Sequence, residues 1–431
     1  VYRKEKDLAK RKLLYHGIDS VSQLAAEYNI PNEYDKLMAS IGANGSNAYT
    51  STDVTCYTED IPSNEVENWL KIQSDRFKNA VIRGFHTELE TVYEEYNMYL
   101  ARDDGKVNNA LLTCIFPTHP YGTQTVIGTQ EHLKNPSIVN IENYYKRYYV
   151  PNNIAVCMSG DFDPDVVIAQ IDKHFGDWQP NRQLSRPEFP ALEPINSHKD
   201  TTVWGQEAEM LALAWRFPAE KELSTDTLEV IAKMMCNGKA GTMEIDLEQP
   251  MKLQAVYVTP YTMTDYSGFV MYVNPIQGQK LEDARALVLD EIEKMKRGEF
   301  ADDLLESVKN NLKLKFYESL LDNGSRANMF VTSFVSGRPW DVAVGKNARI
   351  EGITKQQIVD FLNRHFADNY VCVYKRQGED TTIVKIDKPA ITAIPSNRHL
   401  HSRFLDEITA SHSDPIQPSF VDFSKDMKVF T

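Results

Sequence analysis

The chain is poor in cysteine and has no cysteine pair at a spacing used for metal binding or redox chemistry. Its five cysteines, Cys56, Cys114, Cys157, Cys236 and Cys372, stand singly, without a C-x-x-C motif. This argues against a disulfide framework and against a cysteine zinc site. Most of the cysteines lie beside β-branched or apolar residues, which predicts buried free thiols.

A long apolar run and an excess of basic residues are also missing. No stretch of 18 apolar residues occurs, so no membrane-spanning helix is predicted. The formal net charge of −14 argues against nucleic acid as a partner, because an acidic surface repels phosphates. A hydrophobic fraction of 42% and a charged fraction of 25% are typical of a globular protein. A chain of 431 residues is long enough for two or three domains with full cores.

Changes in composition along the chain predict where these domains begin and end. Residues 1–184 form a first unit, and a second unit covers residues 199–385. The stretch between them, residues 185–198, contains the proline-rich sequence SRPEFPALEPIN, which is typical of a linker. Residues 386–431 lose periodicity and carry many Pro, Ser and His, so we expect an extended tail or a bridge to another part.

The two units look like copies of one another. The sequence IENYYKRYYVPNNIAV from Ile141 aligns with IVDFLNRHFADNYVC from Ile358, at an offset of about 217 residues and with one gap near Pro151. Each copy predicts an amphipathic helix, a short Asn-containing turn and a β-strand. Long helices expected at 281–297 and 302–321, and a strand at 269–273 behind a turn at 265–268, follow in irregular order. This pattern predicts the α+β class, with mostly antiparallel sheets covered by helices on one face.

Two acidic residues on one predicted helix are the first candidates for chemistry. In FHTELETVYEEYN, Glu88, Val92 and Glu95 fall at i, i+4 and i+7, so they share one face. At about 1.5 Å per residue the two acids are roughly 10 Å apart along the helix, too far for one ion to bind both easily. One acid could bind a metal while the other supports it. Acidic residues on a helix are more often a solvated face, and Glu90 with Glu94 makes a competing pair.

The stretch upstream of this helix predicts strands and a second helix. Alternation through Ala48, Thr50, Thr52 and Val54, followed by β-branched and aromatic residues up to Thr58, predicts strands that are interrupted at Gly42, Asn44 and Gly45. The sequence Pro62-Ser63-Asn64 then opens a helix that carries Val66, Leu70 and Ile72.

Together with YGTQTVIGT from Tyr121 and YYVPNNIAVCMSGDFDP from Tyr148, these ordered blocks resemble the pitrilysin/insulinase family of zinc peptidases. The match runs from about Asn32 to about Val373. The resemblance implies that Glu95 is a zinc ligand and Glu88 a supporting acid. It also implies that a peptide or unfolded polypeptide binds as an added strand along Asn47, Ala48, Tyr49 and Thr50.

The family's histidine motif is missing from this sequence. In the family, two histidines of H-x-x-E-H bind zinc and the Glu acts as general base. His16 is the first histidine of the chain, and neither a glutamate nor a second histidine follows it within the next four residues. Val1 is not a methionine, and the pattern of the first residues predicts that they begin inside a charged helix, so we expect a fragment that lacks an upstream motif. The alternative is a natural pseudo-peptidase.

These observations lead to two hypotheses. The first is a zinc-dependent endopeptidase whose chain, as given, is inactive and holds zinc weakly or not at all. The second is a non-catalytic peptide-binding or assembly subunit on the same fold. The first also implies a second peptidase-like half, in the same longer chain or as a partner subunit. Export to a bacterial periplasm is compatible with either, and residues 1–38 look like an insertion relative to shorter members.

Three other groups of residues are weaker candidates. His86 and Glu90 share a helical face, but a lone pair of this kind is more often a surface hydrogen bond. The histidines of the tail, His399, His401 and His412, lie in a segment too loose for a preorganised metal site. The loop Asn237–Thr242 departs from phosphate-loop spacing, so we expect it only to end a helix.

Overall fold

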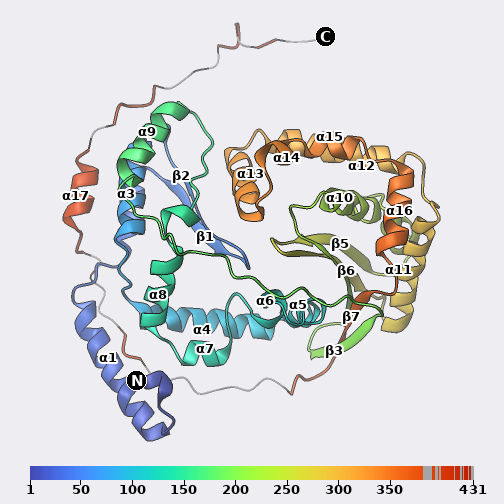
Figure 1. The fold of residues 1–431 in the computed structure, drawn as a ribbon, viewed down its shortest axis with the longest axis horizontal. Helices are drawn as coiled ribbons and strands as arrows, with labels where there is room; N and C mark the ends of the chain where they lie inside the picture. The colour runs from blue at the N-terminus through green and yellow to red at the C-terminus, as the bar shows by residue number, and fades with distance from the viewer. Residues whose placement is uncertain are drawn as a thin grey trace.

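The computed structural model describes residues 1–381, 391–393, 397, 399–411, 413–417, 420, 422–425 and 427–428. Its elements form two units that lie side by side, the first on the left of Figure 1 and the second on the right. Helices α4 (Phe85–Ala101) and α5 (Asp103–Ile115) run along one side and connect them (Figure 1). No described helix is both long and apolar enough to cross a membrane.

The first unit packs helices around a two-stranded antiparallel sheet. Leu70 and Ile72 are buried on helix α3 (Val66–Lys78), which is the helix predicted after Pro62. The remaining elements of this unit are α1 (Leu8–Ala26), α2 (Glu33–Ser40), β1 (Asn44–Thr50), β2 (Thr55–Asp60), α3 (Val66–Lys78), α6 (Pro120–Thr123), α7 (Gln130–Lys134), α8 (Ile138–Tyr148) and α9 (Pro164–Phe175).

Helix α1 differs from the prediction of a helix interrupted at residue 1. The Asp7 side chain accepts hydrogen bonds from the backbone N–H groups of Ala9 and Lys10, so it caps the first turn and the helix begins at Leu8. The sequence interpretation missed this start signal because charged residues surround Asp7 on both sides.

The second unit is built on a five-stranded sheet with the order β3-β7-β4-β6-β5. Strands β3 and β7 are parallel, and the other neighbours are antiparallel. The elements are β3 (Lys199–Gly205), β4 (Met210–Pro218), α10 (Ser224–Met235), β5 (Ala255–Thr262), β6 (Tyr266–Asn274), α11 (Leu281–Lys296), α12 (Leu304–Ser319), α13 (Asn323–Ser336), α14 (Trp340–Val344), α15 (Lys346–Glu351), α16 (Lys355–His365) and β7 (Tyr370–Gln377).

Helices of the second unit cover one face of this sheet and α5 covers the other. Leu213, Trp215 and Phe217 of β4 point into the core under α10, α11, α12 and α16. Ala212 and Ala214, on the opposite face of the same strand, pack against Val107, Leu111 and Ile115 of α5. The α+β class and the mainly antiparallel sheet are confirmed, and α5 buries the second face of the sheet across the boundary between the units.

Local predictions in the second unit are mostly confirmed. Helices α11 and α12 begin and end within two residues of the predicted bounds. The predicted turn at 265–268 is wrong, because residues 266–268 belong to β6, where they pair with β4 and, from Ser267 on, also with β5. Glycine and serine in this stretch suggested a turn, but Ser267 and Gly268 are paired residues of β6.

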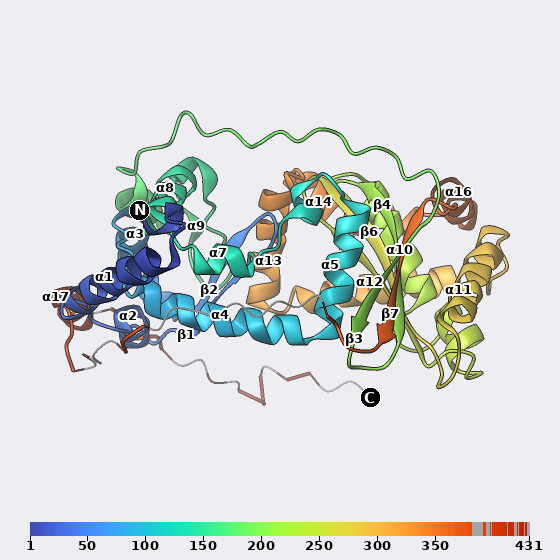
Figure 2. The same ribbon diagram turned by 90° about the horizontal axis from the view of Figure 1, so that it is seen from below.

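The connection between the units and the C-terminal part both run along the surface. Residues 179–198 have no helix or strand and arch over one side of the molecule in Figure 2. Past β7, helix α17 (Arg403–Thr409) packs Phe404, Leu405 and Ile408 on the core of α2, next to Leu37 and Met38. The tail is therefore not wholly extended in its described part, and it returns to the first unit.

The first copy of the repeated helix-turn-strand motif departs from the prediction. In the second copy, α16 leads into β7, which pairs on both sides. In the first copy, α8 leads into residues 154–160, and this segment is not a paired strand.

Candidate functional site

Strand β1 holds the predicted peptide-binding residues at an open edge. All of Asn44–Thr50 is exposed, and within the described part of the chain β1 pairs with β2 alone. Tyr49 is 45% exposed, so it is not a core residue. The backbone N–H of Ala48 donates to the side chain of Asn47 at 2.8 Å. Apart from that N–H, the backbone groups along the outer edge of β1 have no strand partner among the described residues and are open to an extended ligand.

The two acids predicted at the metal site lie on α4. Glu88 and Glu95 are both exposed, and neither lines a described cavity. Among the described residues, no three His, Cys, Asp or Glu side chains come together in a way that could hold a metal ion. The residues present do not fit a zinc site by themselves, so the metal role of Glu95 and the supporting role of Glu88 stay predictions.

The weaker candidates occupy other positions. His86 is half-buried on α4 beside the rings of Tyr15 and Phe85. His401 pairs with Asp406 of α17 at 3.2 Å, whereas His412 lies outside the described residues. The loop after α10 turns its backbone N–H groups to the Glu244 carboxylate, and α10 does end before it.

A polar cluster that the sequence did not reveal joins the end of β1 to the second unit. Asp53 lies in the turn between β1 and β2. Its carboxylate accepts a hydrogen bond from the Tyr121 hydroxyl at 2.8 Å and one from the backbone N–H of Thr264 at 3.1 Å. The Tyr121 hydroxyl in turn accepts from the backbone N–H of Asp265 at 3.0 Å. Arg186 of the linker donates two hydrogen bonds to the Asp265 carboxylate, at 2.7 and 2.9 Å.

His119 is the buried member of this cluster. Its side chain is 1% exposed and lies at the start of α6, directly before the YGTQTVIGT stretch. Its Nδ1 accepts the backbone N–H of Tyr121, and its Nε2 lies 3.3 Å from a carboxylate oxygen of Asp265. Burial lowers the pKa of His119, although Asp265 opposes this effect. A neutral ring with hydrogen on Nε2 lets Nδ1 accept from Tyr121, whereas the 3.3 Å contact of Nε2 with Asp265 does not have hydrogen-bond geometry.

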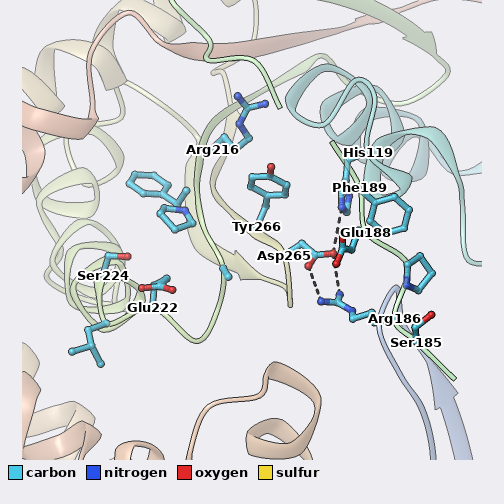
Figure 3. A pocket seen from close by; sticks show the side chains of 15 residues that line it. His119, Ser185, Arg186, Glu188, Phe189, Arg216, Glu222, Ser224, Asp265 and Tyr266 are labelled. Atoms are coloured by element: carbon cyan, nitrogen blue, oxygen red, sulfur yellow. Dashed lines mark hydrogen bonds and ion pairs between the residues drawn. The ribbon is translucent and has the colours of Figure 1, made fainter. Parts of the chain in front are cut away.

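A cavity of about 1410 Å³ opens beside the cluster. Figure 3 shows His119 and Arg186 directed at the Asp265 carboxylate from different segments, with Phe189 and Tyr266 close by. The wall contains both signs of charge and several aromatic rings, and the volume exceeds that of a typical small-molecule pocket. This arrangement suits a stretch of polypeptide better than a compact ligand.

The buried histidine leads to a prediction about pH. Because burial holds the folded pKa of His119 below its usual value, the unfolded chain takes up this proton first as the pH falls. The stabilisation is complete above about pH 6.5 and is lost as the pH falls further. We expect the melting temperature of His119→Gln to fall less between pH 7 and pH 5 than that of the parent chain. Exposed His16 provides the control His16→Gln, and equal slopes for all three proteins would contradict the assignment.

Two family models match consecutive parts of the chain. The model described as Insulinase (Peptidase family M16) matches residues 22–128, and the model described as Peptidase M16 inactive domain matches residues 139–312. The chain belongs to the peptidase M16 family. The predicted resemblance is thereby confirmed, and the zinc peptidases of this family are the relatives of the chain.

Individual M16 relatives agree with this assignment. Zinc protease PqqE of Helicobacter pylori is 25% identical over 317 residues, which cover 70% of this chain and 69% of that protein. The crystal structure of a protease from Helicobacter pylori has a TM-score of 0.75 at 21% identity and covers 84% of this chain and 89% of that one. The periplasmic protease PqqL of Escherichia coli has a TM-score of 0.64 at 15% identity, and 98% of this chain matches 48% of that one.

The sequence contains only part of the information needed to find the polar cluster around His119. Tyr121 belongs to one of the blocks that carry the resemblance, and His119 is two residues upstream. Asp53, Arg186 and Asp265 come from a turn, a linker and a strand start, without mutual spacing that could connect them.

Proposed function

We propose that this M16 chain takes part in zinc-dependent hydrolysis of peptides or small unfolded proteins, and that it binds them as a strand added to β1. The open edge of β1 is the observation that carries the proposal. Main-chain hydrogen bonds along such an edge give affinity with little dependence on side chains. Selectivity would then depend on length and on the walls around the strand.

The polar cluster supports this proposal by orienting β1. Asp53 follows β1 closely and is tied to Thr264 and, through Tyr121, to Asp265 of the second unit. A peptide on β1 would therefore lie beside the second unit, where the cavity lined by Arg186 and Phe189 could take its flanking residues.

The described residues provide the proposed peptide-binding surface but not all of the groups that zinc-dependent hydrolysis needs. We assign Glu95 as a zinc ligand and Glu88 as its support, as the family resemblance implies. Both need a histidine pair and a general base that the described residues do not provide. We therefore derive no hydrolytic step from the residues present.

The β1 proposal makes a direct prediction for Ala48→Pro. Because the Ala48 N–H donates to the Asn47 side chain and not to β2, proline at this position removes a donor from the outer edge. We expect binding of a fluorescein-labelled unstructured peptide, followed by anisotropy, to weaken at least about 10-fold, in line with the loss of main-chain contacts. Ala48→Gly keeps the N–H and should bind like the parent, so equal affinity of the two variants would reject the β1 site.

The metal proposal predicts weak zinc binding. Exposed carboxylates without an imidazole pair do not preorganise a site, so we expect no stoichiometric zinc in equilibrium dialysis at pH 7 and no peptidase activity of the chain as given. Glu95→Gln should not change the result. Tight binding of one zinc ion per chain would show that the chain contains a complete site.

The alternative is a non-catalytic peptide-binding or assembly subunit with the same fold. Both functions use the β1 edge, so peptide binding does not separate them. The coding sequence upstream of residue 1 does: H-x-x-E-H there decides for the peptidase, and a complete reading frame without it decides for the subunit.

We further propose a second peptidase-like half as partner, either in the same polypeptide or as a separate subunit. The match of nearly the whole chain to about half of PqqL supports this. PqqL is a periplasmic protease, so the same likeness supports our proposal that the protein is exported.

A further inference from the structure

Residues 185–191 of the linker are attached to the rest of the chain by side chains alone. All of them are exposed, and their backbone makes no hydrogen bond with any described residue. The stretch ends before Leu192, whose N–H donates to the Tyr266 hydroxyl at 3.1 Å. Its two prolines keep it extended, so it loses little conformational freedom when it lies on the protein. We call residues 185–191 the strap.

Two side chains attach the strap to the polar cluster. The Arg186 guanidinium donates to both oxygens of Asp265, at 2.7 and 2.9 Å, and lies 3.6 Å from a carboxylate oxygen of Asp53. The Phe189 ring meets the His119 ring edge-on, with 4.9 Å between the ring centroids. Arg186 is 53% exposed and Phe189 is 40% exposed. An ion pair this open to water is weak, so the strap is held only loosely.

The strap forms one wall of the large cavity, on the side of the β1–β2 hairpin. Residues 185–189 all line this cavity. Figure 3 shows Phe189, Arg186 and Ser185 along one side of it, with Arg186 directed at Asp265. Because Arg186 also lies beside Asp53 in the hairpin, the strap stands between the end of β1 and the cavity. A peptide on β1 that extends toward the cavity therefore meets the strap first.

His119 lies behind the strap with an unused hydrogen-bonding group. Its side chain is 1% exposed, and its Nε2 has no hydrogen-bond partner among the described residues, although a carboxylate oxygen of Asp265 is only 3.3 Å away. Both oxygens of Asp265 accept from Arg186 instead. A buried N–H without a partner is costly, so the present arrangement satisfies Arg186 at the expense of His119.

Asp265 can pair with His119 once Arg186 leaves. A small rotation of the carboxylate would let one of its oxygens accept from the Nε2 hydrogen. Asp53 would keep its hydrogen bonds from the Tyr121 hydroxyl and from the backbone before β6. Release of the strap therefore leaves neither carboxylate of the cluster unpaired, and the attached and released arrangements lie close in free energy.

We propose that the strap is an autoinhibitory lid, which Arg186 latches onto Asp265 and which must swing out before the flanking residues of a peptide on β1 can enter the cavity. In the open arrangement, Asp265 pairs with His119 and the cavity is continuous with the end of β1. The strap is thus an internal competitor of the peptide. The inhibitory role rests on the proposed peptide binding at β1, whereas the latch itself does not.

A glutamyl endopeptidase measures release of the strap without any peptide ligand. It cuts after Glu188, and the cut requires the neighbouring Arg186 and Phe189 side chains to leave the protein. We expect Arg186→Gln to be cut at this bond about 5-fold faster than the parent, from mass spectrometry of the fragments. Each rate is divided by that of a free peptide with the same linker sequence. Exposed Arg182 has no ion pair among the described residues, so the control Arg182→Gln should be cut like the parent.

Two further variants test whether Asp265 is the partner that holds the strap. Arg186→Lys keeps the charge but loses the paired hydrogen bonds, so its cleavage rate should lie between those of Arg186→Gln and the parent. Asp265→Asn should speed cleavage about as much as Arg186→Gln, and the double variant no more than either. If the effects of the two substitutions multiplied, the pair would not be the latch.

Two fluorescein-labelled peptides measure the inhibitory role by anisotropy. A peptide of seven residues has the length of β1, whereas an unstructured peptide of about 20 residues extends beyond it. In Arg186→Gln we expect about 5-fold tighter binding of the long peptide and unchanged binding of the short one, because only the long peptide has to displace the strap. Ala48→Pro should weaken binding of both peptides.

Several outcomes would contradict the strap. Equal cleavage of Arg186→Gln and Arg182→Gln would show that Arg186 latches nothing. Faster cleavage of Arg186→Gln with unchanged affinity for the long peptide would show that the strap moves but excludes no ligand. If Ala48→Pro bound both peptides like the parent, the β1 site and the inhibitory role would fall together, and the cleavage rates would still decide the latch.

Discussion

Replacing Asp103 by Asn is expected to destabilise the chain by about 3–5 kcal/mol, because it leaves a buried lysine without its counter-charge. Asp103 at the start of α5 is 3% exposed, and its carboxylate lies 2.7 Å from Nζ of Lys375 on β7, which is 1% exposed. Lys375 also donates to the backbone oxygens of Glu207 and Ala208, and the N–H of Glu207 donates to Asp103 at 2.8 Å.

The same ion pair has a defined pH dependence. Burial acts to raise the pKa of Asp103, but the hydrogen bonds from Lys375 and the Glu207 amide outweigh it, and the pKa lies below its usual value. The carboxylate therefore contributes its full stabilisation above about pH 4, and this is lost as the pH falls through the folded pKa.

Denaturant unfolding at pH 7 and pH 3 measures both effects. The adjacent residue Asp104 supplies the control, because its pair with Arg102 is mostly exposed and Asp104→Asn should change the free energy of unfolding little. At pH 3 the difference between Asp103→Asn and the parent should shrink. If Asp103→Asn costs no more than Asp104→Asn at pH 7, the pair does not hold α5 against the second unit.

This ion pair illustrates which parts of the fold a sequence can predict. Helices α10, α11 and α12 were predictable because their apolar spacing and their stop signals are local. The packing of α5 on the second unit was not, because Asp103 and Lys375 are far apart in the chain and neither stands in a recognisable motif.

The sites follow the same division. The helix that carries Glu88 and Glu95 was predicted correctly, and so was the presence of strands before it. The strand bounds were wrong, because Asn44 and Gly45 lie inside β1 and residues 51–54 form the turn to β2. Whether Glu95 meets other ligands depends on tertiary contacts, and in the described chain it meets none that completes a metal group. The His119 cluster needed the structure because it draws on four separate segments.

The prediction of a strand after α8 was wrong for a physical reason. Ile154 to Met158 have the composition of a strand, but a β-strand forms only where a neighbouring strand provides hydrogen-bond partners. The equivalent β7 has two neighbours, whereas residues 154–160 have none among the described residues. The sequence therefore indicated correctly that these residues favour a strand, but it could not show whether a partner strand lies beside them.

The second large effect is expected at Glu244, which organises the loop after α10. Its carboxylate accepts backbone N–H groups from Asn237, Gly238, Lys239 and Gly241, at 3.2, 2.5, 3.0 and 2.7 Å. Because leaving one buried donor unpaired costs about 1–3 kcal/mol, we expect Glu244→Ala to destabilise the chain by roughly 3–5 kcal/mol after partial relaxation of the loop.

Two further variants separate the hydrogen bonds of Glu244 from its charge and its packing. Glu244→Gln keeps the shape but turns an N–H₂ group toward backbone donors, so its free energy of unfolding should lie between those of Glu244→Ala and the parent. Exposed Glu293, on α11, provides the control Glu293→Gln, which should unfold like the parent. Denaturant titration gives all four values. If Glu244→Gln were as stable as the parent, the loop would hold its shape without the carboxylate, and its N–H groups would be free to bind an anion.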